Sequence, residues 1–241
     1  MIETSSIIIL IHLIIAHVVV DFLLQPDSWI EDKRNKGWKS NRLLAHSILA
    51  GIVPLILIWR WDLWYVFLII GITHYMIDAG KCYFDDDLKV FTVDQTLHLA
   101  VVILSWLFIT GTNPDIGILN PLFNEIWNNY ELSTIFLAAF ILLWPTGIAI
   151  GRITEKWRRQ VEKDKRGLDS AGRYIGYAER MIIFSLILVN QYTALGFIVA
   201  TKSIFRMREG SKEAEYYLIG SMLSFFAAIV IGLVVKQLIS M

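Results

Sequence analysis

The sequence predicts an all-α, polytopic integral membrane protein with about eight transmembrane helices, seven being possible. Hydrophobic residues make up 56% of the 241 residues and charged residues only 18%, and the mean hydropathy is +0.55. A soluble domain of this length would be about 25% charged. The apolar residues form long, nearly uncharged blocks, each close to the roughly 20 helical residues that cross a bilayer. The lipid bilayer is therefore the first expected partner.

Six of these blocks are expected to be single spans. They cover residues 5–24, 43–59, 61–77, 92–109, 132–151 and 216–238. A further apolar segment, 174–205, carries Asn190 and Gln191 near its middle. It either crosses the bilayer once with these polar residues inside it, or forms a hairpin of two short helices that turns at them.

The distribution of Lys and Arg favours the hairpin, because short cytoplasmic loops collect basic residues. Basic residues gather in 33–42, in the linker 152–173 and just after 205, whereas 111–130 has none. A single crossing by 174–205 would place two strongly basic stretches on opposite sides of the membrane. We therefore expect eight spans in the bacterial cytoplasmic (inner) membrane, with both chain termini extracytoplasmic.

This topology divides the chain into three parts. Residues 1–110 form a four-helix membrane core, 111–130 an extracytoplasmic loop, and 131–241 the C-terminal membrane helices with the basic cytoplasmic linker 152–173. The linker is a candidate contact for a cytoplasmic protein partner. No nucleic-acid partner is expected, because 22 Lys and Arg residues balance 22 Asp and Glu residues. The single cysteine, Cys82, excludes an internal disulfide and a Cys-rich zinc site.

Four of the predicted spans bring His and Asp side chains to one depth near the cytoplasmic side. The seven residues are His17, Asp21, His46, His74, Asp78, Asp94 and His98. All but His46 belong to i, i+4 pairs, whose members share a helix face. The topology rests on Lys and Arg alone, so this convergence is independent of it. His12, the remaining histidine, lies off that face.

A cluster of imidazoles and carboxylates within a bilayer points to a divalent metal ion. Charged groups there cost several kcal/mol unless they are paired, bind an ion or face water. The mixture of nitrogen and oxygen donors suits Zn, Mn, Fe or Mg, and seven donors allow one or two ions. Asp94 is a candidate general base and Gln25 a candidate for orienting substrate. A proton or cation path, or structural hydrogen bonding between helices, would use the same residues.

Four short motifs carry a family resemblance. They are AHVVVDFLLQ (16–25), AHSILA (45–50), THYMIDAGK (73–81) and DQTLHL (94–99). Together they resemble an uncharacterised bacterial membrane family catalogued as domain of unknown function 3307. Three stretches of the second half, GRYIGYAER (172–180), GFIVATKSIFR (196–206) and EYYLIGSMLSF (215–225), resemble the C-terminal portion of longer members. This resemblance implies the fold and the motif positions but no activity.

A looser similarity is to inner-membrane metal-dependent hydrolases, which combine a His-Ser dipeptide with an HxxxD helix. Here those residues would be His46-Ser47 and His74 with Asp78. The similarity favours a metal-dependent membrane hydrolase. A phosphoester or lipid-like substrate is expected because the predicted site lies at the membrane interface. Three cations of the second half are candidate anion contacts: Arg180, Lys202 and Arg206. Ordinary positive-inside anchoring would also account for them.

Two other functions use the same residues. A proton- or metal-coupled transporter would need polar residues that continue across the bilayer, and His12 and Ser105 are the obvious ones. A non-enzymatic membrane module would use a structural metal to tie four helices together and the linker 152–173 to recruit a partner.

Overall fold

A computed structural model describes residues 4–85, 87–112, 128–161, 171–206 and 212–240, and the regular elements among them are all helices. Six helices are long and apolar enough to cross a membrane: Thr4–Leu23, Asn41–Ile58, Trp61–Lys81, Leu88–Thr112, Tyr130–Val161 and Ala214–Ile239. The predicted all-α fold is thereby confirmed, and the six apolar helices indicate a membrane protein. The chain divides into two compact units, Met1–Leu137 and Ala138–Met241, and each is described by itself.

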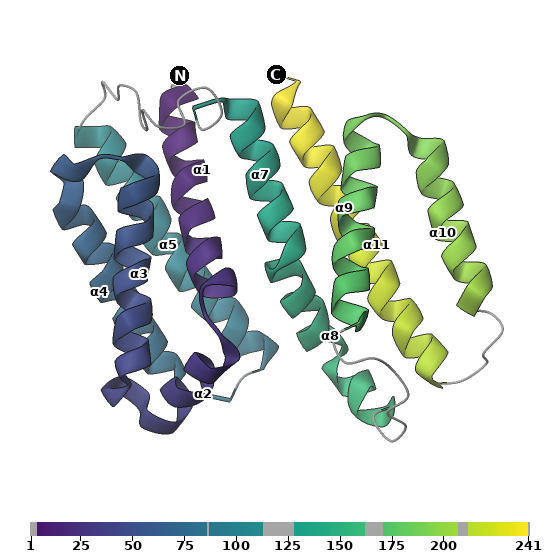
Figure 1. Ribbon diagram of the computed structural model, residues 1–241, viewed down its shortest axis with the longest axis horizontal. Coiled ribbons are helices and arrows are strands. Elements are labelled where there is room, and N and C mark those ends of the chain that lie inside the picture. The colour runs from purple at the N-terminus through teal and green to yellow at the C-terminus, as the bar shows by residue number, and fades with distance from the viewer. Residues whose placement is uncertain (1–3, 86, 113–127, 162–170, 207–211, 241) are drawn as a thin grey trace. The chain divides into compact units, whose positions relative to one another are not determined.

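The N-terminal unit is a ring of four long helices closed at one end by a short one (Figure 1). The long helices are α1 (Thr4–Val18), α3 (Asn41–Ile58), α4 (Trp64–Lys81) and α5 (Leu88–Thr112). Each contacts two others, in the order α1, α3, α4, α5 and back to α1. The short helix α2 (Asp27–Lys36) lies at the lower end of the bundle in Figure 1.

Apolar side chains fill the centre of this ring over most of its length. Ile9 and Leu13 of α1 pack with Phe67 of α4 and Ile109 of α5, and all four are at least 98% buried. Lipid tails are as apolar as these side chains, so close packing rather than water exclusion holds the helices together. The Trp106 indole also donates a hydrogen bond of 2.7 Å to the Ser6 carbonyl, which joins α5 to α1.

A close helix crossing joins α3 and α4 at two glycines. A Cβ on Gly51 would lie 2.7 Å from the Phe67 carbonyl oxygen, and a Cβ on Gly71 would lie 3.0 Å from the Ser47 carbonyl oxygen. Small residues let membrane helices approach this closely. The crossing fixes the spacing between the helices that carry His46 and His74.

Replacing Gly51 by alanine is expected to destabilise the protein by about 1–3 kcal/mol, because the added methyl group overlaps a backbone carbonyl that cannot rotate away. Thermal unfolding in detergent measures the effect. Gly80→Ala is the matched control on α4, since a Cβ there meets nothing within 4 Å. Equal unfolding temperatures for the two variants would show that the crossing is not tight.

Three local features shape the end of the bundle where α2 lies. α1 continues into a π-helical turn, Val19–Leu23, in which the Leu24 amide donates to the Val19 carbonyl at 2.9 Å. Ser40 caps α3 by accepting hydrogen bonds from two backbone amides, and its hydroxyl donates to Asp32 of α2 at 2.6 Å. The Tyr75 hydroxyl donates to the Trp38 carbonyl. These bonds hold α2 and the segment after it against α3 and α4.

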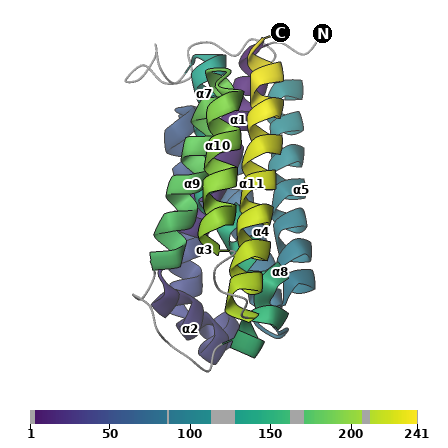
Figure 2. The ribbon, with the colours of Figure 1, turned by 90° about the vertical axis from the view of Figure 1, so that its right-hand side faces the viewer.

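The C-terminal unit contains the end of α7 (Tyr130–Leu143), α8 (Pro145–Val161), α9 (Ala171–Leu188), α10 (Tyr192–Arg206) and α11 (Lys212–Ile239). Pro145 begins α8, because a proline fits the first position of a helix but has no N–H to continue the preceding one. α11 packs against α8 and α9, and α10 against α9. Figure 2 shows α9, α10 and α11 side by side.

The chain reverses between α9 and α10, at the place where the sequence predicted a hairpin. Asn190 adopts a positive φ of 62° there, and its side-chain oxygen accepts a hydrogen bond from Lys236 of α11. Neither helix is among the six that are long and apolar enough to span a membrane. α10 has 15 residues, fewer than the roughly 20 of a usual span. Eight crossings therefore stay a prediction.

The structure describes the predicted linker and the predicted extracytoplasmic loop only in part. α8 continues into the linker 152–173 as far as Val161, and Ile153 and Trp157 extend an apolar stripe past the uncharged block. Residues 162–170 of the linker lie outside the described residues, as do 113–127 of the predicted loop 111–130.

Candidate metal centre

The structure places all seven predicted His and Asp side chains in one cluster of the N-terminal unit, next to α2. Five of them are less than 5% exposed: His46, His74, Asp78, Asp94 and His98. His17 and Asp21 are half-buried at residue level, with side chains 10% and 9% exposed. The i, i+4 spacing within α4 and α5 directs both members of each pair inward. Asp21 comes from the π-helical turn after α1.

Three donor atoms from three different elements converge at one end of the cluster. His46 Nε2 and His74 Nε2 are 3.0 Å apart, and Asp21 Oδ1 lies 3.5 Å from the first and 3.4 Å from the second. Donors around a tetrahedral ion with bonds of about 2.0–2.1 Å are separated by roughly 3.3 Å. The spacing of these three atoms is therefore that of ligands to a common ion.

A second set of three donors lies beside the first. His98 Nε2 is 3.4 Å from Asp78 Oδ1 and 3.5 Å from Asp94 Oδ1. The other oxygen of Asp78, Oδ2, is 3.6 Å from His46 Nε2 of the first set. The Asp78 carboxylate thus spans the two sets, as a carboxylate between two ions would.

His17 and Gln95 complete the cluster. His17 Nε2 is 3.2 Å from Gln95 Oε1, and the Gln95 amide donates to Asp94 Oδ2 at 3.1 Å and to Asp21 Oδ2 at 3.3 Å. The imidazoles of His17, His74 and His98 line a cavity of about 20 Å³ on the side facing the apolar core. That is room for about one water molecule.

Gln25, the candidate for orienting substrate, follows Asp21 by four residues. In the structure it follows the π-helical turn, and its amide nitrogen is buried without a hydrogen bond among the described residues. The π-helical turn takes more residues than an α-helical one, which changes the face of every later residue. Gln95 instead makes the amide contacts to the cluster.

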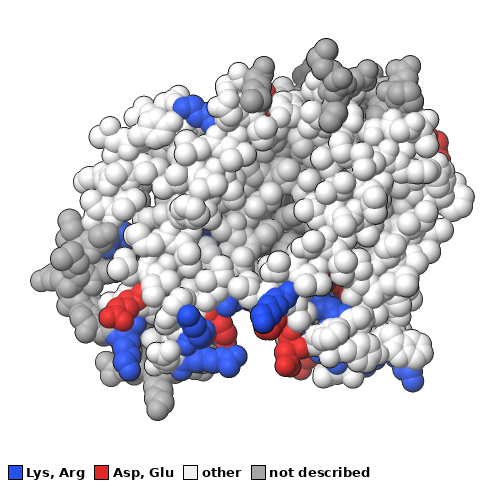
Figure 3. Space-filling model, turned by 180° about the vertical axis from the view of Figure 1, so that it is seen from behind, with Lys and Arg blue, Asp and Glu red and all other residues white. Residues whose placement is uncertain are grey.

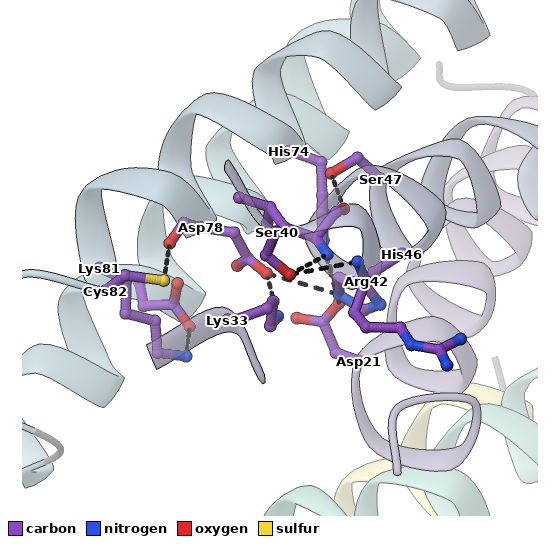
Figure 4. A network of polar contacts seen from close by, with 12 residues as sticks. Asp21, Lys33, Ser40, Arg42, His46, Ser47, His74, Asp78, Lys81 and Cys82 are labelled. Carbon is purple, nitrogen blue, oxygen red and sulfur yellow. Dashed lines mark hydrogen bonds and ion pairs between the residues drawn. The ribbon is translucent and has the colours of Figure 1, made fainter. Parts of the chain in front are cut away.

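Two lysines also belong to the cluster, although in the sequence analysis these basic residues served only to orient the membrane spans. Lys33 of α2 is 7% exposed, and its ammonium lies 2.5 Å from Asp78 Oδ2 (Figure 4). Lys81 lies 2.6 Å from Asp94 Oδ2. Three carboxylates therefore face two ammonium groups, which leaves one negative charge when the imidazoles are neutral. Lys81 follows Asp78 by three residues on one helix, and this spacing places the lysine on the face of the cluster. No short-range pattern in the sequence indicates that Lys33 lies there.

Cys82 lies next to this cluster without joining it. Its thiol donates to the Asp78 carbonyl at 3.2 Å, and burial raises the pKa of the thiol above its usual range. Cys82 belongs to neither donor set.

Replacing Lys33 by methionine is expected to raise the affinity for a divalent cation by about tenfold or more. The ammonium repels a cation and occupies Asp78 Oδ2. The repulsion between two unit charges a few ångströms apart in a protein exceeds the roughly 1.4 kcal/mol that corresponds to a tenfold change in affinity. Equilibrium dialysis against Mn²⁺ measures the affinity. The metal-free variant is expected to unfold at a lower temperature, because Asp78 loses its buried partner.

Lys36→Met is the matched control for this prediction. Lys36 lies on the same helix, but it is exposed and pairs with Asp32 at the surface, where an ion pair contributes about 0–1 kcal/mol. The affinity of the Lys36→Met variant for Mn²⁺ should equal that of the wild type. Equal affinities for all three proteins would show that Lys33 does not oppose a cation in the cluster.

Comparison with known proteins bears on the segment that contains the cluster. Residues 9–124 match the family model described as Protein of unknown function (DUF3307). This part of the chain is similar to that family. The DUF3307 match includes all seven His and Asp residues and both lysines, and it confirms the resemblance seen in the motifs. No curated protein and no solved structure matches the chain. The similarity to inner-membrane hydrolases, and that of the second half to longer members, stay predictions.

The three predicted anion contacts all lie in the C-terminal unit. Arg180 is 4% exposed, and its guanidinium donates to the carbonyls of Leu142 and Leu143 and to the Ser224 hydroxyl. Lys202 forms an ion pair with Glu179. The side chain of Arg206 lies outside the described residues.

Proposed function

We propose that the N-terminal unit is the centre of a metal-dependent membrane hydrolase that holds one or two divalent ions. The observation that supports this most strongly is the Asp78 carboxylate between two sets of three donor atoms. The second set, Asp78, Asp94 and His98, offers three protein donors, which would leave coordination positions for water and substrate, whereas a purely structural site is usually closed by four. A phosphoester or lipid-like molecule at the membrane surface is the proposed substrate.

The donor atoms of the cluster fit a bound cation. Asp21 Oδ1 and Asp94 Oδ1, one from each set, are buried and accept no hydrogen bond among the described residues. Leaving a charged oxygen without a partner costs more than the roughly 1–3 kcal/mol of a neutral group. A cation would satisfy both oxygens. Imidazole with carboxylate suits Zn, Mn, Fe or Mg.

Each group of the chain has a role in this proposal. His46, His74 and Asp21 would hold one ion, and His98 with Asp94 a second, with Asp78 shared between them. A bound divalent ion supplies Lewis acidity and makes water a nucleophile at neutral pH.

The neighbouring side chains would orient these ligands and move the proton. Gln95 holds the His17 ring and the Asp94 carboxylate in place. Asp94 remains the proposed general base, and Gln25 the proposed substrate contact. Lys33 and Lys81 would neutralise surplus carboxylate charge.

The proposed membrane topology has eight crossings, with the cluster near the cytoplasmic surface and both termini outside. The face shown in Figure 3 supports an embedded protein, since Lys, Arg, Asp and Glu gather along one edge and a wide surface carries almost none. The turn at Asn190 supports the two short crossings α9 and α10. This orientation places α2 and the linker 152–173 on the cytoplasmic side.

Single-cysteine labelling tests this topology. In a Cys82→Ser background, Gln191→Cys in the α9–α10 turn is expected to react with a membrane-impermeant maleimide on intact cells. Asn35→Cys on the exposed face of α2 should react only after permeabilisation. Labelling of both from outside, or of neither, would contradict the proposed eight-span arrangement.

The hydrolase proposal is tested with protein loaded with Mn²⁺ or Zn²⁺ in detergent and offered phosphatidic acid and soluble phosphoesters. Turnover is expected in the wild type and in Asp62→Asn, and it should be lost in Asp78→Asn. Asp62 pairs with Arg60 on the surface outside the cluster. Tightly bound metal that neither exchanges nor supports turnover would favour the structural module.

Transport is the alternative function, and the same purified protein, reconstituted in liposomes, tests it. A transporter would need a polar path through the N-terminal unit. His12 and Ser105 are buried in this unit, but so are the tightly packed apolar side chains of Leu13, Phe67 and Ile70. Uptake of Mn²⁺ without hydrolysis of any phosphoester would favour the transporter and contradict the hydrolase.

A further inference from the structure

We propose that the C-terminal unit binds an organic phosphate in a cavity of its own, independently of the metal centre. The cavity has a volume of about 410 Å³ and is lined by residues of α8, α9, α10 and α11. Its polar lining includes Arg180, Lys202, Glu179, Ser221 and Ser224. Ligand pockets usually measure about 300–1,000 Å³, so the space suits a phosphate with an attached organic group.

The buried guanidinium of Arg180 is the observation that points to an anion. Its Nε donates to the Leu142 carbonyl at 2.5 Å, Nη2 to the Leu143 carbonyl at 3.4 Å and Nη1 to the Ser224 hydroxyl at 3.1 Å. The two carbonyls lie just before Pro145, where the helix is interrupted. All three acceptors are neutral, and no carboxylate of the described residues forms an ion pair with Arg180. A buried cation without a counterion is costly.

Arg180 also retains the donors that a phosphate needs. A guanidinium has five N–H groups, and three of them are used, so Nη1 and Nη2 each keep one. Two glycines make room at these nitrogens: a Cβ on Gly176 would lie 3.1 Å from Nη1 and a Cβ on Gly147 would lie 3.2 Å from Nη2. One N–H on each terminal nitrogen is the arrangement that binds phosphate in a bidentate manner.

The charge of the cavity suits a phosphate. Lys202 and Glu179 form an ion pair and cancel each other, which leaves the positive charges of Arg180 and Arg173, both of which line the cavity. The hydroxyl groups of Ser221 and Tyr216 line the same space and suit a polyol attached to the phosphate. Such a ligand is a phospholipid headgroup or a soluble organic phosphate, which share this chemistry.

Filling the cavity tests the proposal without touching Arg180. Gly151 and Gly220 line the cavity, and a Cβ on either meets nothing within 4 Å, so Gly151→Leu and Gly220→Leu should fold. Gly196→Leu is the matched control, because its site on α10 is equally open but is not part of the lining. The three variants and the wild type are delipidated in a non-ionic detergent. Dioleoyl phosphatidylglycerol, dioleoylglycerol or glycerol 3-phosphate is then added.

Phosphatidylglycerol at about 100 times its Kd is expected to raise the unfolding temperature of the wild type and of Gly196→Leu by about 5–10 °C. The two cavity-filled variants should keep the unliganded unfolding temperature and lose this rise, and native mass spectrometry should show less retained lipid. An equal rise with glycerol 3-phosphate would support the site and assign a soluble ligand. An equal rise with dioleoylglycerol, or an undiminished rise in both cavity-filled variants, would overturn the proposal.

Discussion

Replacing Asp78 by asparagine is expected to weaken binding of a divalent cation by more than about 100-fold at both donor sets. The carboxylate lies 3.4 Å from His98 Nε2 and 3.6 Å from His46 Nε2, so one substitution removes a charged ligand from each set. Even residues that only orient metal ligands contribute about 10–100-fold to affinity. Asparagine has nearly the same shape, so the helix packing around position 78 should persist. Equilibrium dialysis against Mn²⁺ and Zn²⁺ measures the change.

Asp62→Asn makes the same chemical change outside the cluster. Asp62 pairs with Arg60 at 2.7 Å and its side chain is 57% exposed. Its metal affinity should equal that of the wild type. Wild-type affinity in Asp78→Asn would mean that the carboxylate does not bind the ion and that its pair with Lys33 is structural.

Replacing His46 by glutamine is expected to remove one donor set and leave the other. His46 is fully buried, and its Nε2 faces Asp21 and His74. The second set, formed by Asp78, Asp94 and His98, keeps all its donor atoms. If the wild type binds two ions, the variant should bind one, and the affinity of the lost site should fall by more than about 100-fold.

His12→Gln is the control for this prediction, because His12 is also a fully buried histidine of the N-terminal unit but belongs to neither donor set. It should keep the wild-type stoichiometry, whatever its effect on stability. An equal loss of metal in both variants would show that general destabilisation, and not loss of a ligand, explains the result for His46.

Helical periodicity was sufficient to predict which side chains meet. The pairs His74 with Asp78 and Asp94 with His98 are spaced by four residues on regular α-helices, so their shared face follows from the sequence. His46 could be placed at the same depth because its span begins on the same predicted side. These short-range regularities gave the seven residues that the structure brings together.

Features that depend on irregular or long-range structure could not be predicted. The π-helical turn Val19–Leu23, which changes the helix face of the residues after it, has no sequence signature. Lys33 reaches Asp78 only because α2 folds back beneath the bundle, across 45 residues of sequence.

The reversal of the chain at Asn190, by contrast, could be predicted, because Asn190 and Gln191 are polar residues inside an apolar block.

Elemental analysis of the protein, purified in detergent without chelator and without a histidine tag, tests the central claim most directly. The account predicts one or two equivalents of Zn, Mn or Fe in the wild type, and a clear loss in His74→Ala and Asp78→Ala. Folded wild-type protein with no bound metal, and no uptake of Mg²⁺, Mn²⁺ or Zn²⁺ on dialysis, would contradict it. The His and Asp cluster would then be a hydrogen-bonded network neutralised by Lys33 and Lys81.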